Sequence, residues 1–293
     1  MPNETTNPKR RARVTCLFRG RLGNQMYQVA TVLAHAWDHG LRPVFGRFNR
    51  QYVANPDHGG LNRVVQEFSR LPKRPVVVLR PSAYTIREPR GAANPKALRD
   101  VPGRDRILDG LFGNETYYAH HRTRIVDSFA ASRSVDRHLT RSYGEVLTGT
   151  TVSVSIRRGD FLKQKVLRRL DEDLDWYRAA LDRIPDVDRV LVFSDDPDWC
   201  REHAIFTRNT IVVPAVRPYD HLYLMGRCTH NIISNSSFAW WGAWLAPAEG
   251  RVVVVPEVWK TNGIAEPLPP ADAQADTGLP GPANAHTAGW IRM

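Results

Sequence analysis

Apolar runs and amphipathic stretches alternate along the second half of the chain. Runs rich in valine and isoleucine predict buried strands at residues 151–156, 189–193, 210–213, 231–233 and 251–255. Between them, the spacing of apolar residues predicts helices at residues 174–184, 197–203, 219–227 and 238–245. Strands that alternate with helices of about ten residues are typical of βαβ units in a parallel sheet. We therefore expect an α/β domain here.

The first half of the chain shows one clear unit of this kind. Residues 13–18 predict a strand, residues 19–24 a turn, and residues 25–39 a helix that ends at Gly40, where a left-handed C-cap is expected. Further along, residues 76–79 predict a buried strand, and the Pro- and Arg-rich residues 80–103 predict a loop.

Composition places the chain among ordinary soluble globular proteins. It has 293 residues, of which 42% are hydrophobic and 24% charged. No apolar run approaches the roughly 18 residues of a membrane span, and the polar, basic amino terminus does not resemble a secretory signal. The cysteines, Cys16, Cys200 and Cys228, are too far apart to indicate a disulfide framework or a zinc site. We expect a cytoplasmic protein.

The net charge of +11 changes this picture only slightly. The arginines are scattered and often stand beside acids, and the one basic cluster, residues 9–13, is short and terminal. This pattern favours a basic surface that attracts anionic ligands or an anionic membrane over a nucleic-acid interface.

Polar clusters follow the predicted strands of the second half at the points where they end. These clusters are residues 157–160 (RRGD), 194–196 (SDD) and 234–237 (SNSS). Ligands of an open parallel sheet bind at the carboxyl ends of its strands. The three clusters therefore predict a single site at one sheet edge.

The chemistry of these clusters suits an anion. Arg157 and Arg158 can donate charge-assisted hydrogen bonds to phosphate, although a surface ion pair is the alternative. Asn235, Ser236 and Ser237 precede a predicted helix, where free N–H groups and the helix dipole attract anions. A simple helix cap explains them equally well.

Two other segments carry chemistry-bearing residues. The turn at residues 20–25 (GRLGNQ) lacks the third glycine of a dinucleotide-binding loop, but Asn24 and Gln25 suit sugar hydroxyls. Residues 171–173 (DED) resemble a metal-binding D-x-D. Their place in an acidic, solvated stretch at a helix start favours an interaction with the helix dipole instead.

Several motifs together resemble the α-1,2-fucosyltransferases, glycosyltransferase family 11. These motifs also follow one another along the chain in the same order as in that family. They are residues 20–26 (GRLGNQM), 112–118 (FGNETYY), 155–160 (SIRRGD), 193–196 (FSDD), 230–245 (HNIISNSSFAWWGAWL) and the closing 290–291 (WI). The long block at residues 230–245 is the most specific of these, and the resemblance covers nearly the whole chain.

The resemblance implies an α/β fold of the GT-B type, with two Rossmann-like parallel-sheet domains facing a cleft. The domains expected are a basic N-terminus at residues 1–12, an acceptor-side domain at 13–150, a GDP-sugar-binding domain at 151–260, and a Pro/Gly/Ala-rich segment at 261–293. The implied enzyme uses GDP-L-fucose, inverts the anomeric centre, and needs no metal ion or other cofactor.

Site residues follow from the matched motifs. The resemblance implies that Arg158 stabilises the charge on the leaving β-phosphate. The other implied donor-binding residues lie in four motifs; they are Gly23, Gln25, Arg157, Asp195, Asp196, Asn235, Ser236, Ser237 and Phe238. Asp160, Glu115 and Asn24 are the candidates for activating or binding the acceptor hydroxyl, and Asp160 is favoured; Glu115 is also a weak acceptor-binding candidate.

The sequence also departs from the family pattern. Ser155 stands where many members have a histidine, Phe161 where they have a tyrosine, His221 where an aspartate is common, and Ala239 where a serine is common. A serine cannot replace a histidine in proton transfer, so these changes leave room for a different donor or acceptor.

The sequence is compatible with three functions. The first transfers L-fucose to a glycan hydroxyl, expected to be the 2-OH of a galactoside, on a lipid-linked intermediate of a surface polysaccharide; the basic surface would help such an enzyme visit the inner membrane face. The second keeps the fold but uses another GDP-6-deoxyhexose or forms another linkage. The third, much less favoured, is a nucleotide-sugar or nucleic-acid binding protein without turnover.

Overall fold

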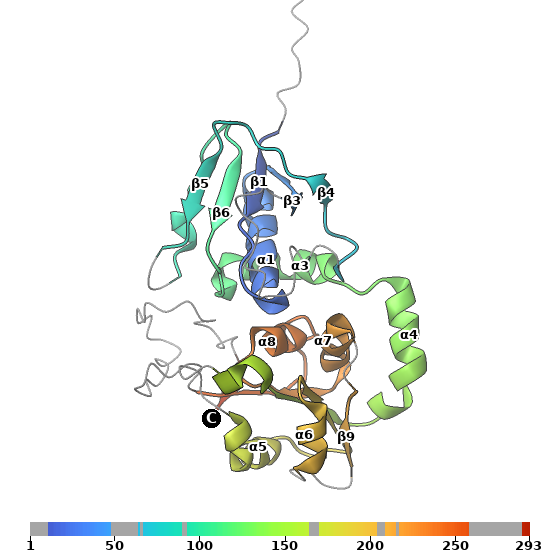
Figure 1. The fold of residues 1–293 in the computed structure, drawn as a ribbon. Helices are drawn as coiled ribbons and strands as arrows, with labels where there is room; N and C mark the ends of the chain where they lie inside the picture. Colours follow the sequence, from blue (N-terminus) through green and yellow to red (C-terminus); the bar gives the residue numbers. More distant parts are fainter. Residues whose placement is uncertain are drawn as a thin grey trace, which may run out of the picture. The chain divides into compact units, whose positions relative to one another are not determined.

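The computed structural model describes residues 11–47, 64, 67–89, 93–163, 170–203, 209–214, 217–257 and 289–293. The chain forms two compact units, Met1–Phe129 and Ala130–Met293, which are described separately (Figure 1). Residues 1–10 of the expected basic N-terminus and most of the expected C-terminal segment lie outside the described residues.

The boundary between the units falls earlier than the expected division at residues 150 and 151. Helix α4 (Arg133–Tyr143) belongs to the second unit, where it packs against helix α7 (Pro218–Arg227). Arg227 on α7 forms an ion pair with Asp136 on α4 and donates a hydrogen bond to Thr140 Oγ1 at 3.4 Å. These contacts hold the segment before residue 150 to the second unit.

The second unit is built on a parallel sheet of six strands. Its strands are β7 (Thr151–Ile156), β8 (Arg189–Ser194), β9 (Thr210–Val212), β10 (His230–Ile232), β11 (Val253–Val255) and β12 (Ile291–Arg292). Every residue of β7 is buried, as expected for a strand covered on both faces. Each strand predicted from the sequence in this half is present, whereas β12 lies in the C-terminal segment for which we predicted no strand.

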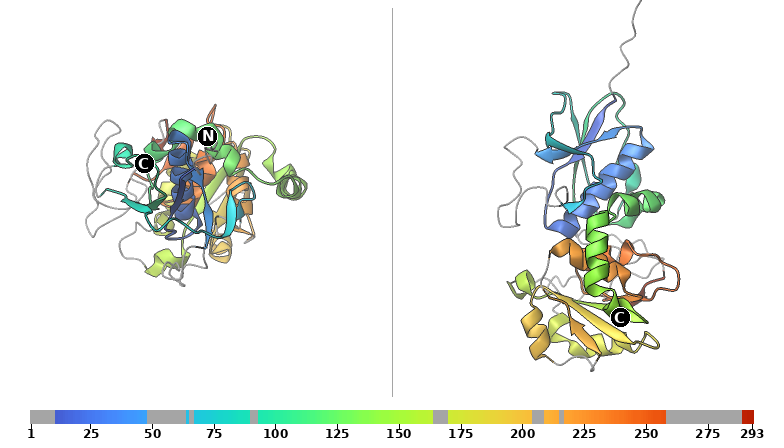
Figure 2. Two further views of the ribbon diagram at one scale, coloured as in Figure 1. Left: turned by 90° about the horizontal axis from the view of Figure 1, so that it is seen from above. Right: turned by 90° about the vertical axis from the view of Figure 1, so that its right-hand side faces the viewer.

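Helices cover both faces of this sheet. Helices α5 (Leu174–Leu181) and α6 (Pro197–Glu202) lie on one face, and α7 and α8 (Ser237–Trp244) lie on the other (Figures 1 and 2). Helix α8 is apolar all round and buries Trp240, Trp241 and Trp244, whose rings pack on one another. The helices predicted here are therefore confirmed. The short 3-10 helices of this unit are η6 (Glu145–Leu147), η7 (Gly159–Lys163) and η8 (Leu170–Glu172).

The strand order of this sheet locates its binding edge. Counted from β7, the order β9-β8-β7-β10-β11-β12 corresponds to the Rossmann order 3-2-1-4-5-6. The order reverses between β7 and β10, which pair in parallel through Val152, Ser153 and Val154 on β7. In open sheets of this kind the ligand crevice lies outside the carboxyl ends of the strands at the reversal.

The first unit has a parallel sheet of order β2-β1-β6-β5 and a separate parallel pair, β3-β4. The strands are β1 (Arg13–Cys16), β2 (Arg42–Pro43), β3 (Phe45–Arg47), β4 (Lys73–Val76), β5 (Tyr84–Arg87) and β6 (Arg106–Asp109). The helices are α1 (Leu22–Asp38), α3 (Arg122–Ser128), η3 (Pro95–Ala97), η4 (Glu115–Tyr117) and η5 (Ala119–His121). Helix α1 packs on β1, and nearly all of its residues up to Ala36 are buried.

The strand–turn–helix unit predicted at the start of the chain is confirmed, but two other predictions for this half were wrong. The strand expected at residues 76–79 lies at Lys73–Val76 instead, and Val78 is 66% exposed. Strand β5 lies inside the predicted loop at residues 80–103. As an edge strand, β5 buries only Ile86, so it lacks the apolar run that marks a covered strand.

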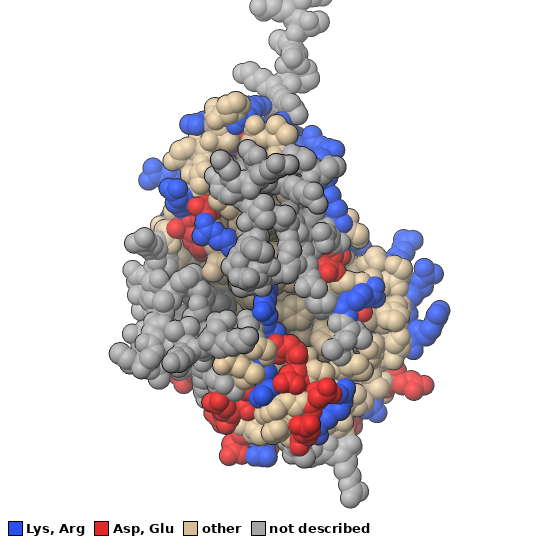
Figure 3. Space-filling model, in the orientation of Figure 1, with Lys and Arg blue, Asp and Glu red and all other residues tan. Residues whose placement is uncertain are grey.

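No helix among the residues that the structure describes is long and apolar enough to cross a membrane. On the face drawn in Figure 3, Lys and Arg side chains are interspersed with Asp and Glu, and a group of basic side chains stands over α4. The described residues of this face therefore do not form the single-sign stripe typical of a nucleic-acid interface.

Candidate functional site

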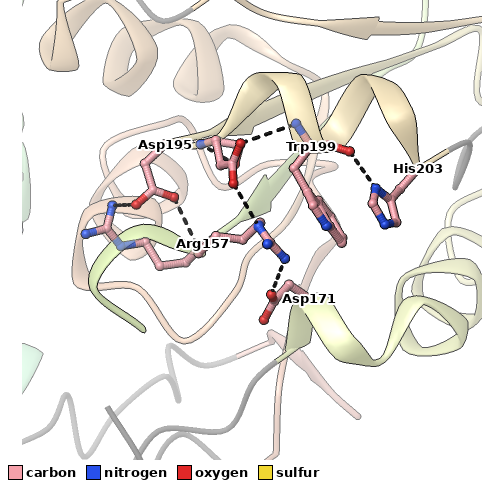
Figure 4. Close-up of polar contacts among 8 residues, drawn as sticks. Arg157, Asp171, Asp195, Trp199 and His203 are labelled. Atoms are coloured by element: carbon pink, nitrogen blue, oxygen red, sulfur yellow. Dashed lines mark hydrogen bonds and ion pairs between the residues drawn. The ribbon is translucent and has the colours of Figure 1, made fainter. Parts of the chain in front are cut away.

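The first turn after β7 lies at the point where the strand order reverses, and it carries Arg157 and Arg158. Asp195 and Asp196 follow β8, the neighbouring strand; Asp195 pairs with Arg157, and Asp196 pairs with Arg158. The sequence prediction that these two clusters meet at one sheet edge is confirmed by these contacts (Figure 4). The edge therefore concentrates charged groups where a ligand of this sheet would bind.

Arg158 is held on several sides. Its Nη1 group lies 2.6 Å from Asp171 Oδ2 and its Nε lies 3.0 Å from Asp196 Oδ2. The guanidinium also stands over the Trp199 ring, with its central carbon 4.0 Å from the ring centroid. The side chain is 14% exposed, and its Nη2 group has no hydrogen-bond partner within the described part of the chain. The guanidinium is thus fixed in orientation and keeps donor groups for a ligand.

Arg157 is paired separately. Its Nη1 group lies 2.6 Å from Asp195 Oδ2, and the other oxygen of Asp195 accepts a 2.9 Å hydrogen bond from the Arg158 backbone N–H. A Cβ at Gly159 would overlap the Asp195 carboxylate, so glycine at this position lets the carboxylate approach the backbone of the turn. Asp195 therefore fixes both the side chain of Arg157 and the backbone of the turn.

Asp171 is a site residue that the sequence reasoning missed. Its side chain is fully buried beside Arg158, which contradicts our expectation of a solvated acidic stretch. Asp173, in the same stretch, caps α5 by accepting a hydrogen bond from Trp176 N at 3.1 Å, in agreement with a helix start. The two acids thus have separate partners, and neither their spacing nor their composition indicates which one faces the arginine.

Asp196 has a double role. Its Oδ1 atom accepts a hydrogen bond from Trp199 N at 3.2 Å and so caps α6, while its Oδ2 atom contacts Arg158. Trp199 on α6 lies against the Arg158 guanidinium. Its ring is in turn stacked on the His203 ring, with the centroids 4.0 Å apart. Helix α6 therefore supplies the carboxylate and the aromatic ring that orient Arg158.

The turn after β10 begins helix α8. Ser236 Oγ caps α8 by accepting a hydrogen bond from Ala239 N at 3.5 Å, and Asn235 is buried. Ser237 and Phe238 form the first turn of the helix, where the dipole is positive. Ser236 therefore has the capping role that the sequence suggested. The N-terminus of α8 that it caps lies at the carboxyl edge of the sheet, so the cap does not exclude an anion-binding role.

Ser155, at the family's histidine position, is a buried structural link. Its Oγ atom lies 2.8 Å from Ser234 Oγ and accepts a hydrogen bond from Ser234 N at 3.0 Å. The Tyr177 hydroxyl donates to the Ser155 carbonyl at 3.1 Å. Ser155 therefore joins the end of β7 to the turn after β10.

His221 is also buried, against the ring of Phe193. Its Nε2 atom lies 2.8 Å from the Pro214 carbonyl oxygen, and burial lowers the pKa of the imidazole. A neutral histidine that donates to this carbonyl holds α7 to the segment after β9.

The remaining candidates lie in the first unit. Gln25 holds the turn before α1, because its Nε2 donates to the Gly20 carbonyl at 3.1 Å and its Oε1 accepts from Val64 N at 3.2 Å. Gly20 has a φ of 69°, and a Cβ there would overlap the side chain of Asn24. Gly23 is buried in the first turn of α1. The turn is thus tightly packed around Asn24.

Glu115 begins η4, which Asn114 caps by accepting from Thr116 N at 2.9 Å. The segment before it is positioned by Glu88, a residue that we did not single out from the sequence. Glu88 accepts hydrogen bonds from the backbone N–H groups of Leu111 at 2.7 Å and Phe112 at 2.9 Å. Burial raises the pKa of Glu88, and these two bonds oppose that rise. They hold Phe112 at a φ of 53°, which is costly for an aromatic residue.

Asp160, the favoured candidate for the base, lies in η7 with Gly159. Its side chain is outside the described part of the structure.

A sequence profile of Glycosyl transferase family 11 matches residues 95–266. Among curated proteins, the chain is 32% identical over 52% of its length to an O-antigen biosynthesis glycosyltransferase, WbnK, of Escherichia coli, and 30% identical over 51% to an α-1,2-colitosyltransferase of the same species. These alignments cover 54% of each relative, so the chain spans about half the length of these two proteins. It is also 29% identical to galactoside α-(1,2)-fucosyltransferase 2 of Sus scrofa, over 78% of the chain and 68% of that protein.

The fold is similar to solved structures as well. The structure of the fucosyltransferase NodZ from Bradyrhizobium superposes with a TM-score of 0.54 at 15% identity, covering 82% of this chain and 95% of that one. Together with the two parallel sheets, this likeness confirms the predicted α/β fold with Rossmann-like domains of the GT-B type.

Proposed function

The chain belongs to glycosyl transferase family 11, and we propose that it transfers L-fucose from GDP-β-L-fucose to a hydroxyl group of a glycan. We propose further that the acceptor is the 2-OH of a galactoside, that the anomeric centre is inverted, and that no metal ion takes part. One observation carries the proposal: Arg158 lies at the strand-order reversal of a Rossmann-like sheet with its guanidinium fixed and its Nη2 group available to a ligand.

The reaction breaks the bond between the fucose anomeric carbon and an oxygen of the β-phosphate. The electron pair of that bond stays on the phosphate oxygen, so negative charge develops there as GDP leaves. A guanidinium that is already oriented can stabilise this charge without reorganisation in the transition state. Arg158 takes this role, and the N-terminal end of α8 at Ser236 and Ser237 adds backbone N–H groups and a favourable dipole.

The acceptor oxygen attacks the opposite face of the anomeric carbon, and its proton passes to a base. Asp160 is the base that we favour, because it follows Arg158 in the same turn. Ser155 is not a candidate, because its hydroxyl is buried and bonded to Ser234.

Asp195 and Asp196, which the matched motifs imply to be donor-binding residues, lie against the arginines. Asp195 pairs with Arg157, Asp196 pairs with Arg158, and Asp196 also caps α6. We propose that they act as positioning residues for the phosphate-binding pair. Three aspartates around two arginines would also restrain the arginines from moving between donor-bound and free states.

Three relatives bear on the sugars. The similarity to a galactoside α-(1,2)-fucosyltransferase supports the proposed donor and linkage, and the similarity to an O-antigen glycosyltransferase supports a surface polysaccharide, carried on a lipid, as acceptor. A second candidate is transfer of another GDP-linked deoxyhexose. The similarity to an α-1,2-colitosyltransferase, together with the serine at position 155, favours this alternative specifically.

The first test is thermal stabilisation of the purified protein in excess EDTA by GDP, GDP-fucose, GDP-mannose, UDP-galactose and ADP. A ligand at about 100 times its Kd adds roughly 2.7 kcal/mol to the unfolding free energy, which is measurable as a higher Tm. We expect GDP and GDP-fucose to stabilise the protein, and UDP-galactose and ADP to leave the Tm unchanged. Equal stabilisation by all nucleotides, or by none, would refute the guanine-specific donor site.

The second test is product formation from GDP-fucose and from other GDP-deoxyhexoses with a panel of galactosides. We expect a product with an α-1,2 linkage, identified by NMR, whose rate is unchanged by EDTA. Release of GDP only when another GDP-deoxyhexose is supplied would select the second candidate.

A further inference from the structure

Three metal-ligating side chains meet at the C-terminal end of α1. Asp38 is the last residue of α1, and His120 and His121 belong to η5. His121 Nε2 lies 2.6 Å from Asp38 Oδ1, and His120 Nε2 lies 3.0 Å from Asp38 Oδ2. The two elements come together across 82 residues of sequence, within the first unit.

The arrangement of these atoms suits a metal ion. One ligand atom from each residue can be chosen so that all three atoms lie within 4.8 Å of one another. Ligand atoms of a tetrahedral zinc ion lie about 2.0–2.2 Å from the metal, so they stand a little over 3 Å apart. Small rotations of the side chains are enough to bring the three ligand atoms to this spacing, since Asp38 is 38% and His120 48% exposed.

The surrounding residues orient the ligands before any ion binds. The His121 ring packs edge-on against Trp37 with centroids 5.2 Å apart, and Arg124 covers Trp37 at 3.9 Å. The rings of His120 and His121 are 4.5 Å apart. His121 is therefore held by packing, while His120 keeps more freedom.

The position of Asp38 in its helix also calls for a positive partner. The C-terminal end of an α-helix carries partial negative charge, so a carboxylate there is unfavourable unless a cation lies beside it. The two histidines stand in that place, because their Nε2 atoms lie 2.6 Å and 3.0 Å from the two oxygens of the Asp38 carboxylate.

We propose that Asp38, His120 and His121 form a binding site for one divalent transition-metal ion of the zinc type. Two imidazole nitrogens and one carboxylate oxygen favour Zn²⁺, Co²⁺ or Ni²⁺ over Mg²⁺ and Ca²⁺, which prefer oxygen ligands alone. The bound ion links the end of α1 to η5, and water completes the coordination that three protein ligands leave open. The transfer chemistry proposed for the second unit does not use this ion.

The test is calorimetric titration of the tag-free, full-length protein with ZnCl₂ after dialysis against a chelator. Absorption of Co²⁺ in the visible range gives a second readout that reports coordination directly. We expect one ion per chain, and a rise in Tm on addition of Zn²⁺. MgCl₂ at the same concentration should produce no heat and no change in Tm.

Substitutions separate this site from adventitious binding. Loss of an outer partner of a metal ligand already weakens binding by about 10- to 100-fold, so His121→Asn should weaken Zn²⁺ binding at least that much. The double variant His120→Asn/His121→Asn should lose the stoichiometric site, and Asp38→Asn should weaken it. His138→Asn, at an exposed histidine of α4, is the matched control and should bind Zn²⁺ as the wild type does.

The proposal is overturned if the wild type takes up no stoichiometric Zn²⁺. It is also overturned if the double variant, shown by circular dichroism to be folded, binds Zn²⁺ as tightly as the His138→Asn control. Neither result bears on the proposed transferase activity, which is measured in EDTA.

Discussion

The carboxyl edge of the second unit's sheet and the C-terminal end of α1 in the first unit are both crowded with charged side chains, but they are built differently. At the sheet edge, Arg157 and Arg158 carry permanent charges and pair with aspartates, of which Asp171 is fully buried. At the end of α1, histidines take the place of the arginines, and Asp38 is partly exposed. The first cluster is built on two guanidinium groups, whereas the second combines imidazole and carboxylate groups, which are the side chains that bind zinc-type ions.

This difference fits separate tasks. A group that stabilises a leaving phosphate must be charged in every catalytic cycle, so a fixed guanidinium is well suited to this role. A cluster that joins two elements of the fold can instead contribute a stabilisation that varies with pH. Substitutions at the sheet edge should therefore act on activity, whereas substitutions and pH changes at the end of α1 should act on stability.

The largest effect is expected for Arg158→Lys. Lysine keeps the charge, but its ammonium cannot contact Asp171 and Asp196, lie flat on Trp199 and donate to a phosphate at the same time. We expect kcat, measured as GDP release at saturating donor, to fall by about 100- to 1,000-fold, the cost of losing one transition-state donor.

The matched control for this variant is Arg178→Lys. Arg178 is an exposed arginine on α5 that forms an ion pair with Asp175 three residues away, and its kcat should stay within about twofold of the wild type. Near-normal turnover of Arg158→Lys, measured beside this control, would remove Arg158 from its proposed role.

The next largest effect concerns His35, in the last turn of α1. Its Nε2 atom lies 3.0 Å from Arg106 Nη1, and Arg106 is itself buried and paired with Asp100. Burial, with the nearby His39 and Arg106, lowers the pKa of His35 from 6.5 to about 4. Because the unfolded chain binds this proton more readily, the stabilisation is fully present above pH 6.5 and is lost as the pH falls toward 4.

The shift in the pKa of His35 corresponds to about 3 kcal/mol of unfolding free energy between these pH values. Urea unfolding at several pH values should show a steeper loss for the wild type than for His35→Gln, which keeps a hydrogen-bond acceptor for Arg106. His221 and His230, whose pKa values burial also lowers, act in the same direction and remain in both proteins. Identical pH profiles for the wild type and His35→Gln would contradict the prediction, and exposed His138→Gln provides the control.

A smaller effect is expected for Asp171→Asn. Asparagine keeps the shape and can still accept a hydrogen bond from Arg158, but the charge that strengthens this bond is gone. Hydrogen bonds to charged groups contribute about 1.5–3 kcal/mol, so we expect kcat to fall by about tenfold or more. As a positioning residue, Asp171 should affect kcat more than the KM for the donor.

The control for this variant is Asp175→Asn, which removes an exposed carboxylate of α5. Kinetic constants of both variants at equal folded fractions separate positioning from general destabilisation. If Asp171→Asn lowers Tm but leaves kcat at the value of the control, Asp171 serves only the stability of the fold.

The two clusters also differ in how far the sequence predicts them. Parallel strands end at one edge, so the apolar runs before Arg157 and Asp195 are enough to predict that these residues lie together. The partner of Arg158 in η8 could not be predicted, because Asp171 stands in an irregular segment whose spacing carries no periodicity. The stacking of Trp199 on Arg158 follows only from the position of α6 in the fold.

In the first unit, fewer strands and fewer side-chain contacts can be predicted from the sequence. Strand β5 exposes most of its residues at the sheet edge, so no apolar pattern marks it. Glu88 and Asp38 acquire their partners through contacts between segments far apart in sequence, at 23 and 82 residues. Single acidic residues at such distances from their partners give no local signal, unlike a buried strand, which is marked by its own side chains.

A modest effect on stability, without one on turnover, is expected for Ser155→Ala. The alanine leaves the Ser234 N–H and hydroxyl without the Ser155 oxygen in a buried position. Loss of such a partner costs about 1–3 kcal/mol of unfolding free energy. We expect a lower Tm with kcat within about twofold of the wild type. A large loss of kcat at full folding would instead give the Ser155 hydroxyl a role in the reaction.

The smallest effect is expected for Asp38, and its sign is opposite to what a simple helix-dipole argument gives. A carboxylate at the C-terminal end of α1 should destabilise the helix, but the two histidines lower the pKa of Asp38 and make its ionised form favourable. The contribution is therefore present above the ordinary pKa of 3.8 and is lost as the pH falls below it. Because the pair is partly exposed, we expect Asp38→Asn to cost at most about 1 kcal/mol at neutral pH without added metal. Urea unfolding should show this difference shrinking as the pH falls through 4, whereas a difference that grows in acid would mean that the histidines do not compensate the carboxylate.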